Sequence, residues 1–258
     1  MTESKKTYQA PAVEKAFRLL RQVADADEAP RLSDLAGSLN ISKGTAHGLI
    51  KALESAGALT RDNETKRFSL GPAVVELALK DQTYLRLGAL AQPVLDELQT
   101  RIGETVFFGL MHPWQALVMA TSETRNPMKI SSRPGDTIPL LAGALGKLYL
   151  SLADASRAEQ ILQDKGMPAY TPASIQEQDL YLKEVETVRK TGVALDRGEY
   201  MTGVNALAVA AHDTQPLALW VVGFAGSLDE EKISKIKDLI LTAGKRLTKI
   251  QNSSNSLK

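Results

Sequence analysis

The sequence contains no cysteine, which excludes disulfide bonds and thiolate metal sites and favours a reducing compartment. It also lacks a long apolar run, because stretches such as residues 217–224 are far shorter than the ~20 residues that span a bilayer. The first six residues have no apolar core of the kind found in a signal peptide. We therefore expect a cytoplasmic protein without a membrane contact.

Histidine is scarce as well. His47, His112 and His212 are widely separated, so none of them has the sequence spacing of a metal ligand. Residues 192–199 contain two glycines but lack the glycine pattern and the Lys-Ser/Thr ending of a phosphate-binding loop. We expect no metal, no cofactor and no catalytic residue.

The length of 258 residues is near the value expected for two domains. Hydrophobic residues make up 43% and charged residues 24%, which gives no compositional reason to expect large-scale disorder. The net charge of +1 neither supports nor excludes a nucleic-acid partner, since a small basic patch can be neutralised by the rest of the chain.

The first seventy residues have the pattern of a winged helix-turn-helix. Apolar residues at helical spacing predict a helix from residue 12 to the acidic loop at 25–30, and a second short helix over 32–39. A tight connection leads to a third helix, which is richer in polar side chains and which Gly57 ends. Alternating residues around a turn at 62–65 then predict a β-hairpin wing.

The remainder is predicted to mix strands and helices. Pro72 can begin a helix that runs to Leu87, which we interpret as an interdomain helix and a candidate dimer contact. Another helix is expected over residues 89–102. Capping-box patterns at 174–177 and 227–230 predict two further helix starts. The expected strands are 106–110, 116–121, 129–132, 193–195, 204–211 and 217–223.

The predicted fold class is therefore α/β of the α+β type, with an antiparallel or mixed sheet covered by helices in the second domain. The expected segments are a disordered tail at 1–10, a winged helix-turn-helix domain at 11–71, a linker helix at 72–87, a second domain at 88–251 and a disordered tail at 252–258.

The start of the third helix is the candidate DNA-reading segment. A major groove about 12 Å wide accepts one α-helix, whose N-terminal polar side chains read the base edges. Basic residues of the wing would contact the flanking backbone or the minor groove. These residues could equally be solvated side chains on a small helical domain. The candidates are Ser42, Lys43, Gly44, Thr45, His47 and Lys51 on the helix, and Lys66 and Arg67 in the wing.

Several motifs, taken in order over residues 11–250, resemble the isocitrate lyase regulator (IclR) family of bacterial transcription factors. The resemblance implies a winged helix-turn-helix domain, a GAF-like effector domain, and dimers that often pair into tetramers. Family members often have arginine where this chain has Gly48, which leaves the operator sequence open. The motifs are LSDLA at 32–36, ISKGTAHGLIKALE at 41–54, FSLG at 68–71, RPGDTIPL at 133–140, ALGK at 144–147, GVALDRGE at 192–199 and Gly203-Val204.

The resemblance also implies an effector site between the sheet and the loop before the ALGK helix. Ala144 and Leu145 would offer backbone N–H groups to a carboxylate, and Asp196 would bind the ligand or organise the loop. Small-acid sensors of this kind have polar side chains at three further positions, where this chain is apolar. The remaining candidates are Ile130, Ile138 and Val204 as the wall, and Ala206, Trp220 and Val222 at those three positions.

Replacing polar groups by Trp220 and aliphatic side chains adds apolar surface, worth about 25 cal/mol per Å² buried. We therefore expect an effector with apolar or aromatic surface, such as an aromatic acid, rather than glyoxylate or pyruvate. Trp220 could instead be an ordinary core residue.

Two other function classes stay open at this point. Asp196 and Glu199 could act as acid and base in an enzyme with a helical appendage, although a turn-stabilising role is favoured for such a segment. A GAF-like module that binds another protein is the second alternative.

The expected partners are double-stranded operator DNA, a small-molecule effector and copies of the same chain, as a dimer or a dimer of dimers. The sequence does not fix the sign of regulation.

Overall fold

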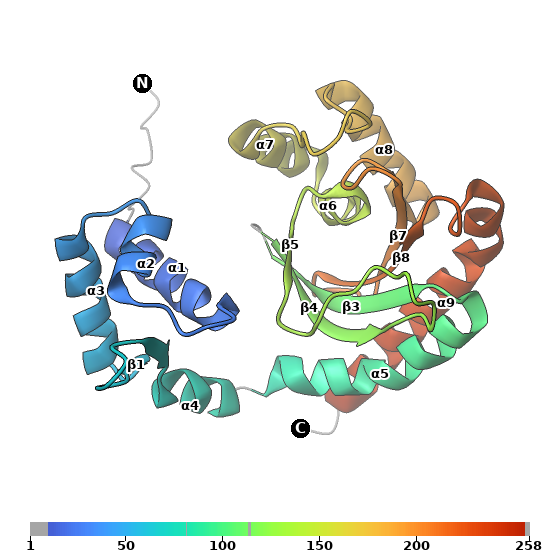
Figure 1. The fold of residues 1–258 in the computed structure, drawn as a ribbon. Coiled ribbons are helices and arrows are strands. Elements are labelled where there is room, and N and C mark those ends of the chain that lie inside the picture. Colours follow the sequence, from blue (N-terminus) through green and yellow to red (C-terminus); the bar gives the residue numbers. More distant parts are fainter. Residues whose placement is uncertain (1–9, 81, 113–114, 256–258) are drawn as a thin grey trace. The chain divides into compact units, whose positions relative to one another are not determined.

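The computed structural model describes residues 10–80, 82–112 and 115–255 (Figure 1). The chain forms two compact units that divide between Gln82 and Thr83. Of the tail expected at 1–10, residues 1–9 lie outside the described residues, and Ala10 is the N-cap of the first helix.

The N-terminal unit packs three helices and a hairpin around one small core. Its elements are α1 (Pro11–Asp25), α2 (Leu32–Ser38), α3 (Lys43–Ser55), β1 (Leu59–Arg61), β2 (Phe68–Leu70) and α4 (Pro72–Lys80). The core is formed by the apolar stripes that the sequence predicts, with Leu19, Leu35, Ile50 and Phe68 each at most 2% exposed. The helix-turn-helix and its wing are therefore confirmed as structural elements.

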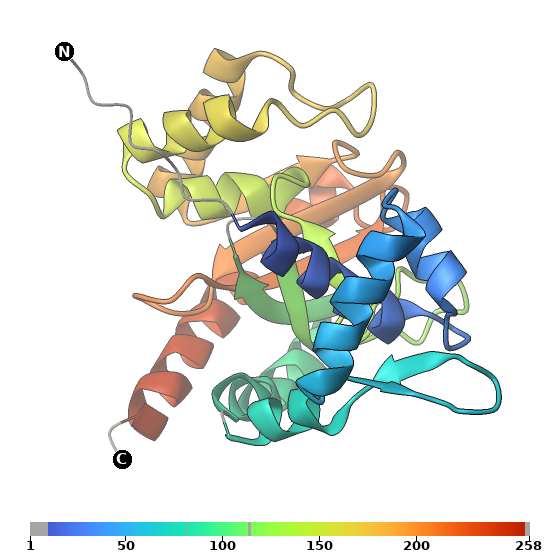
Figure 2. The ribbon, with the colours of Figure 1, turned by 90° about the vertical axis from the view of Figure 1, so that its left-hand side faces the viewer.

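The wing is an antiparallel hairpin in which Leu59 pairs with Leu70 and Arg61 with Phe68. It extends from the unit as a two-stranded projection (Figure 2). The carboxylate of Asp62 closes the turn, because it accepts hydrogen bonds from the N–H groups of Glu64 and Thr65.

The expected linker helix over 72–87 differs from the structure. The segment forms two helices: α4 ends at Lys80, and α5 (Thr83–Ile102) includes the separately expected helix 89–102. Apolar residues recur through both segments, so the periodicity gave no sign of the break. The two helices also differ in packing, since α4 buries no residue and α5 buries seven.

The C-terminal unit contains one six-stranded antiparallel sheet with strand order β5-β4-β3-β8-β7-β6. Its strands are β3 (Thr105–Met111), β4 (Gln115–Ser122), β5 (Thr137–Pro139), β6 (Ala194–Arg197), β7 (Val204–Ala210) and β8 (Leu217–Phe224). Its other helices are α6 (Gly143–Ser151), α7 (Ala155–Lys165), α8 (Gln178–Thr191) and α9 (Glu230–Asn255). This arrangement confirms the predicted fold class.

Helices cover the two faces of this sheet differently (Figure 1). Large aliphatic side chains such as Leu219 and Val221 face α5 and α9. On the opposite face, alanines of β7 and β8 and the ring of Trp220 pack toward α6. Because side chains alternate along a strand, one sheet supports an aliphatic core on one face and smaller side chains with Trp220 on the other.

Two local expectations of the C-terminal unit differ from the structure. Residues 129–132 form no strand, and Lys129 instead pairs with Glu123 at 2.5 Å, while the edge strand is β5. Ser174 does not cap a helix, because α8 begins at Gln178 and the Ser174 hydroxyl bonds to a distant turn. At the second capping-box pattern, Asp229 accepts from the N–H of Lys232 as α9 begins.

The C-terminal helix is longer than expected. α9 continues to Asn255, so residues 252–255 of the expected tail are helical, and residues 256–258 lie outside the described part of the chain. None of the helices in the described part combines the length and the apolar character that a bilayer crossing requires.

Candidate functional sites

Ser42 fixes the start of α3. Its Oγ accepts a hydrogen bond from the N–H of Thr45 at 3.1 Å and lies 2.9 Å from Thr45 Oγ1. A serine at this position satisfies one of the N–H groups that a helix leaves free in its first turn. The Ser42 hydroxyl therefore already has a partner within the chain.

The six candidate DNA-contacting residues of α3 are all exposed. Lys43, His47 and Lys51 follow one another at intervals of four residues, which places them along one side of the helix. A Cβ at Gly48 would meet no heavy atom within 4 Å, so the surface beside His47 is open. This side of α3 offers a basic row without an apolar obstruction.

The two wing candidates are held differently. Lys66 is exposed, has a φ of +59° and donates to the carbonyl oxygen of Asn63 at 2.5 Å. The Arg67 guanidinium donates to the carbonyl oxygen of Ala29 at 2.6 Å and pairs with Glu28 at 3.1 Å. Arg67 therefore ties the wing to the loop before α2, a contact that the sequence did not indicate.

Most of the candidate effector residues meet on the sheet face that packs against α6. Asp196 and Val204 lie on β6 and β7 at the edge of this face, where Asp196 pairs in register with Ala206. Ile130 is half-buried in the segment between β4 and β5 and is not a member of this cluster. The six that share the cluster are Ile138, Ala144, Leu145, Ala206, Trp220 and Val222.

Trp220 is 2% exposed and stacks on Phe107, with the ring centroids 5.5 Å apart. Its neighbours across the sheet are small: Ala208 pairs with it in register, and a Cβ at Gly109 would lie 3.0 Å from the indole. Small neighbours make room for the indole, so Trp220 is part of the core of this face.

The first turn of α6 begins inside the protein. Gly143, Ala144 and Leu145 are buried, and their N–H groups have no hydrogen-bond partner among the described residues. Gly143 has a φ of +48°, and a Cβ there would lie 1.8 Å from Asp196 Oδ2, so only glycine fits. Buried N–H groups at a helix start form an anion-binding site, and Asp196 lies directly beside it.

Burial raises the pKa of Asp196 to about 6 from 3.8, and the nearby Glu199 carboxylate adds to this rise. The Glu199 N–H, which donates to Asp196 Oδ1 at 2.7 Å, and the Lys147 ammonium act in the opposite direction. Asp196 therefore changes its charge close to neutral pH.

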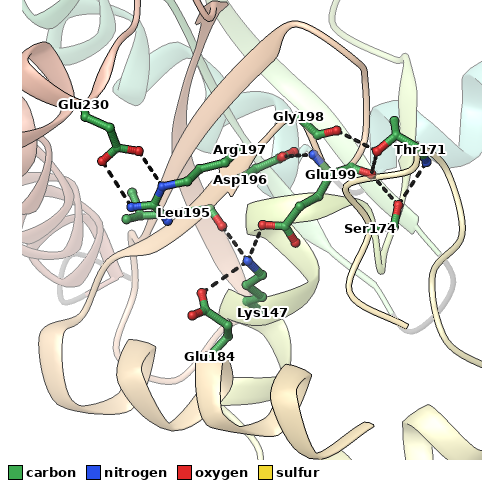
Figure 3. Close-up of polar contacts among 10 residues, drawn as sticks. All are labelled: Lys147, Thr171, Ser174, Glu184, Leu195, Asp196, Arg197, Gly198, Glu199 and Glu230. Atoms are coloured by element: carbon green, nitrogen blue, oxygen red, sulfur yellow. Dashed lines mark hydrogen bonds and ion pairs between the residues drawn. The ribbon is translucent and has the colours of Figure 1, made fainter. Parts of the chain in front are cut away.

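The sequence did not assign a role to Lys147, although it belongs to the ALGK motif. Its side chain is 1% exposed, and its ammonium lies 2.5 Å from Glu199 and 3.3 Å from Glu184 (Figure 3). The available signal was one charge in an otherwise apolar helix, since a buried charge requires a partner. The partner itself lies 52 residues away.

A surface groove of about 490 Å³ lies apart from these residues. It is lined by Pro139, Leu140, Leu141 and residues 164–170, and by none of the nine candidate effector residues.

Two family models match the chain. "Bacterial transcriptional regulator IclR C-terminal" matches residues 82–249, and "IclR helix-turn-helix domain" matches residues 12–63. The chain belongs to the IclR family. It is thus a transcriptional regulator with a DNA-binding helix-turn-helix domain and a C-terminal effector domain.

Relatives of this IclR-family regulator align over most of its length. The glycerol operon regulatory protein of Streptomyces coelicolor is 28% identical, covering 84% of this chain and 85% of its own. The transcriptional repressor IclR of Escherichia coli is 23% identical, covering 94% and 90%. These are names of regulators and not of enzymes.

An IclR homologue from Microbacterium hydrocarbonoxydans, solved in complex with 4-hydroxybenzoate, has a similar fold. Its TM-score is 0.76 at 19% identity, and the match covers 94% of this chain and 99% of that one.

Replacing Asp196 by asparagine is expected to stabilise the protein at pH 7.5. A carboxyl whose pKa is higher in the folded than in the unfolded state favours folding while it is protonated. This contribution to the free energy of unfolding is lost as the pH rises through 6, whereas asparagine stays neutral. The rise from 3.8 to about 6 corresponds to at most about 3 kcal/mol. Thermal unfolding as a function of pH measures the gain, which should vanish below about pH 4.

Asp136→Asn is the matched control. The pKa of Asp136 is lowered by the Arg133 N–H and the Ser132 hydroxyl, so this variant should lose stability at neutral pH. If Asp196→Asn also lowers the unfolding temperature at pH 7.5, the assigned electrostatics of Asp196 are wrong.

Proposed function

We propose that the exposed basic row of α3 reads operator DNA and that a carboxylate effector, bound at the first turn of α6, modulates this reading. The observation that carries the effector part is the set of three buried N–H groups without a partner in the described chain. Because bacterial DNA lies in the cytoplasm, this function also places the protein there.

The DNA part rests on the geometry of α3. A rise of about 1.5 Å per residue separates Lys43, His47 and Lys51 by about 6 Å each, so the three together follow one groove. Thr45 is exposed in the same first turn. Lys66, beside the turn of the wing, is exposed and forms no ion pair within 4 Å in the described part of the chain, although it lies near Asp62, so it is suited to a flanking phosphate. Arg67 would act indirectly, by orienting the wing.

An aromatic acid suits the effector site better than a two-carbon acid. Its carboxylate would accept from the N–H groups of Ala144 and Leu145, and its ring would contact the apolar wall formed by Ile138, Ala206 and Val222. The 4-hydroxybenzoate complex of the Microbacterium homologue supports this class of ligand. A second carboxylate beside Asp196 requires one shared proton, which a pKa of about 6 for Asp196 makes available near neutral pH.

A second copy of the chain would cover the apolar side chains that α4 leaves exposed. Leu77 is 70% exposed, and Val75 and Leu79 are exposed to a similar degree. Apolar side chains in such a patch indicate an interaction surface. We propose a dimer, or a dimer of dimers, whose α4 contacts hold two reading heads at a fixed spacing, so that the effector can favour one arrangement of them.

Replacing Lys43, Thr45 and His47 together by alanine should weaken binding to the upstream region of the regulator's own gene by at least about tenfold. The negative slope of log affinity against log salt concentration should become shallower by about one, because one phosphate contact is lost. Electrophoretic mobility shifts at several salt concentrations measure both quantities. The control variant Lys183→Ala, Thr187→Ala and Lys190→Ala removes similar groups from exposed positions of α8 and should change neither quantity. Native affinity of the α3 variant would rule out the assignment.

Effector binding should change the emission of Trp220 through the sheet face that it shares with the site. With Trp114 replaced by phenylalanine, Trp220 is the single tryptophan. We expect 4-hydroxybenzoate to alter its emission and 4-hydroxybenzyl alcohol, which lacks the carboxylate, to bind at least about tenfold more weakly. Binding of glyoxylate, together with no response to aromatic acids, would contradict the proposed effector class.

Leu77→Asp should weaken the dimer and the operator affinity together, because it places a charge in an apolar contact. Analytical ultracentrifugation and the mobility-shift assay measure the two effects. Glu76→Gln, at the adjacent exposed position, is the control and should affect neither strongly. Should Leu77→Asp keep both native properties, α4 is not the dimer contact.

A further inference from the structure

Lys147 is a buried charge whose surroundings lie next to the proposed effector site. Every other residue of α6 is apolar or small, apart from the half-buried Tyr149 and Ser151. A buried ammonium is strongly unfavourable unless each of its protons has an acceptor. The acceptors of Lys147 therefore show which segments the helix is fixed against.

All three acceptors lie on the two segments that flank α6. The ammonium donates to Glu199 at 2.5 Å, to the carbonyl oxygen of Leu195 at 2.8 Å and to Glu184 on α8 at 3.3 Å. Leu195 directly precedes Asp196 on β6. Lys147 thus contacts the main chain on one side of Asp196 and the side chain of Glu199 on the other.

Glu199 joins this contact to two further segments (Figure 3). Its N–H donates to Asp196 Oδ1 at 2.7 Å. Its carbonyl oxygen accepts from the Ser174 hydroxyl at 2.7 Å and from the Thr171 hydroxyl at 3.2 Å. One residue therefore holds the turn after β6 against α6, against Asp196 and against the loop before α8.

The register of α6 makes this arrangement specific. Gly143 and Lys147 are four residues apart and so lie on the same side of the helix. At the first position the missing side chain admits Asp196 Oδ2, and at the second the ammonium reaches Glu199. A small shift of α6 along its axis would bring Gly143 out of line with the carboxyl.

We propose that Lys147 and Glu199 are positioning residues, and that their buried ion pair holds the Asp196 carboxyl against the first turn of α6 and thereby builds the polar end of the effector site. The effector part of this proposal rests on the function proposed above. The placement of Asp196 by the pair does not, and it can be tested without a ligand.

Lys147 and Glu199 shift the ionisation of Asp196 in opposite directions. The groups that face it are Lys147 from α6, Tyr181 from α8, and Glu199 with the N–H of Tyr200 from the turn. Glu184 of α8 faces Lys147, and the neighbouring Arg197 pairs with Glu230. Lys147 favours the ionised Asp196, whereas the carboxylate of Glu199 disfavours it.

The test follows the ionisation of Asp196 in the ligand-free, full-length protein. With ¹³C-labelled aspartate carboxyl groups, Asp196→Asn identifies the signal, and its pH titration gives the midpoint. We expect Lys147→Met to raise this midpoint and Glu199→Gln to lower it, each by about one pH unit. Lys232→Met, which breaks a similar pair with the buried Glu104 at 2.5 Å, should leave it unchanged.

A purely structural role gives a different result. If loss of the pair only loosened the site, water would reach Asp196 and the midpoint would fall in both variants. A shift of the midpoint in the same direction in Lys147→Met and Glu199→Gln, or no shift in either variant, would therefore overturn the proposal. Should Lys147→Met fail to fold, the double variant with Glu199→Gln leaves neither partner of the ion pair as an unpaired charge. Its midpoint should return from the Glu199→Gln value toward the native one.

Calorimetry with 4-hydroxybenzoate tests the consequence for binding. Glu199→Gln should lower its affinity by about tenfold, and Lys232→Met should not change it. If the native protein does not bind this acid, the proposed effector class fails, and the titration of Asp196 still decides whether Lys147 and Glu199 position it. Native affinity in Glu199→Gln would show that the pair does not build the site.

Discussion

The N-terminus of α6 sets the main constraint on the effector unit. A helix that begins inside a protein leaves N–H groups that need acceptors, and Gly143, Ala144 and Leu145 leave three of them buried together. The sheet supplies small side chains around them and one carboxyl, Asp196, which closes the polar end. An anionic ligand group would complete this arrangement, which is why the site suits a sensor.

Charge placement around this helix start follows from the same burial. Asp196 is difficult to ionise there, and Glu199 would make it more so without the ammonium of Lys147. The lysine also neutralises Glu199 and contacts the strand that carries Asp196. The contacts of Lys147 and Glu199 thus connect a helix, a turn and a loop.

In the N-terminal unit, the candidate functional side chains of α3 are exposed and not buried. Its small core fixes α3 through Ile50 and Phe68, and Ser42 fixes the start of the helix, so the polar side of α3 needs no internal partners. The exposed lysines and His47 remain available to another molecule. In the proposed function, this IclR-family regulator would read DNA with α3 and respond to a ligand through the buried charges of its C-terminal unit.

The helix-turn-helix, its wing and an antiparallel or mixed sheet covered by helices could be predicted from the sequence, because the periods of helices and strands and the glycine and serine signals are local. The segment around Ala144 is identified through the resemblance of its motif to the IclR family. Four features required the three-dimensional structure: the division of the apolar segment into α4 and α5, the lack of a strand at 129–132, the contact of Ser174 with Glu199 and the partner of Lys147. Each of these depends on which distant segments the topology brings together. Local periodicity does not encode such long-range contacts. A lysine in an apolar helix therefore indicates that a buried charge needs a partner, but the sequence does not indicate which residue is that partner.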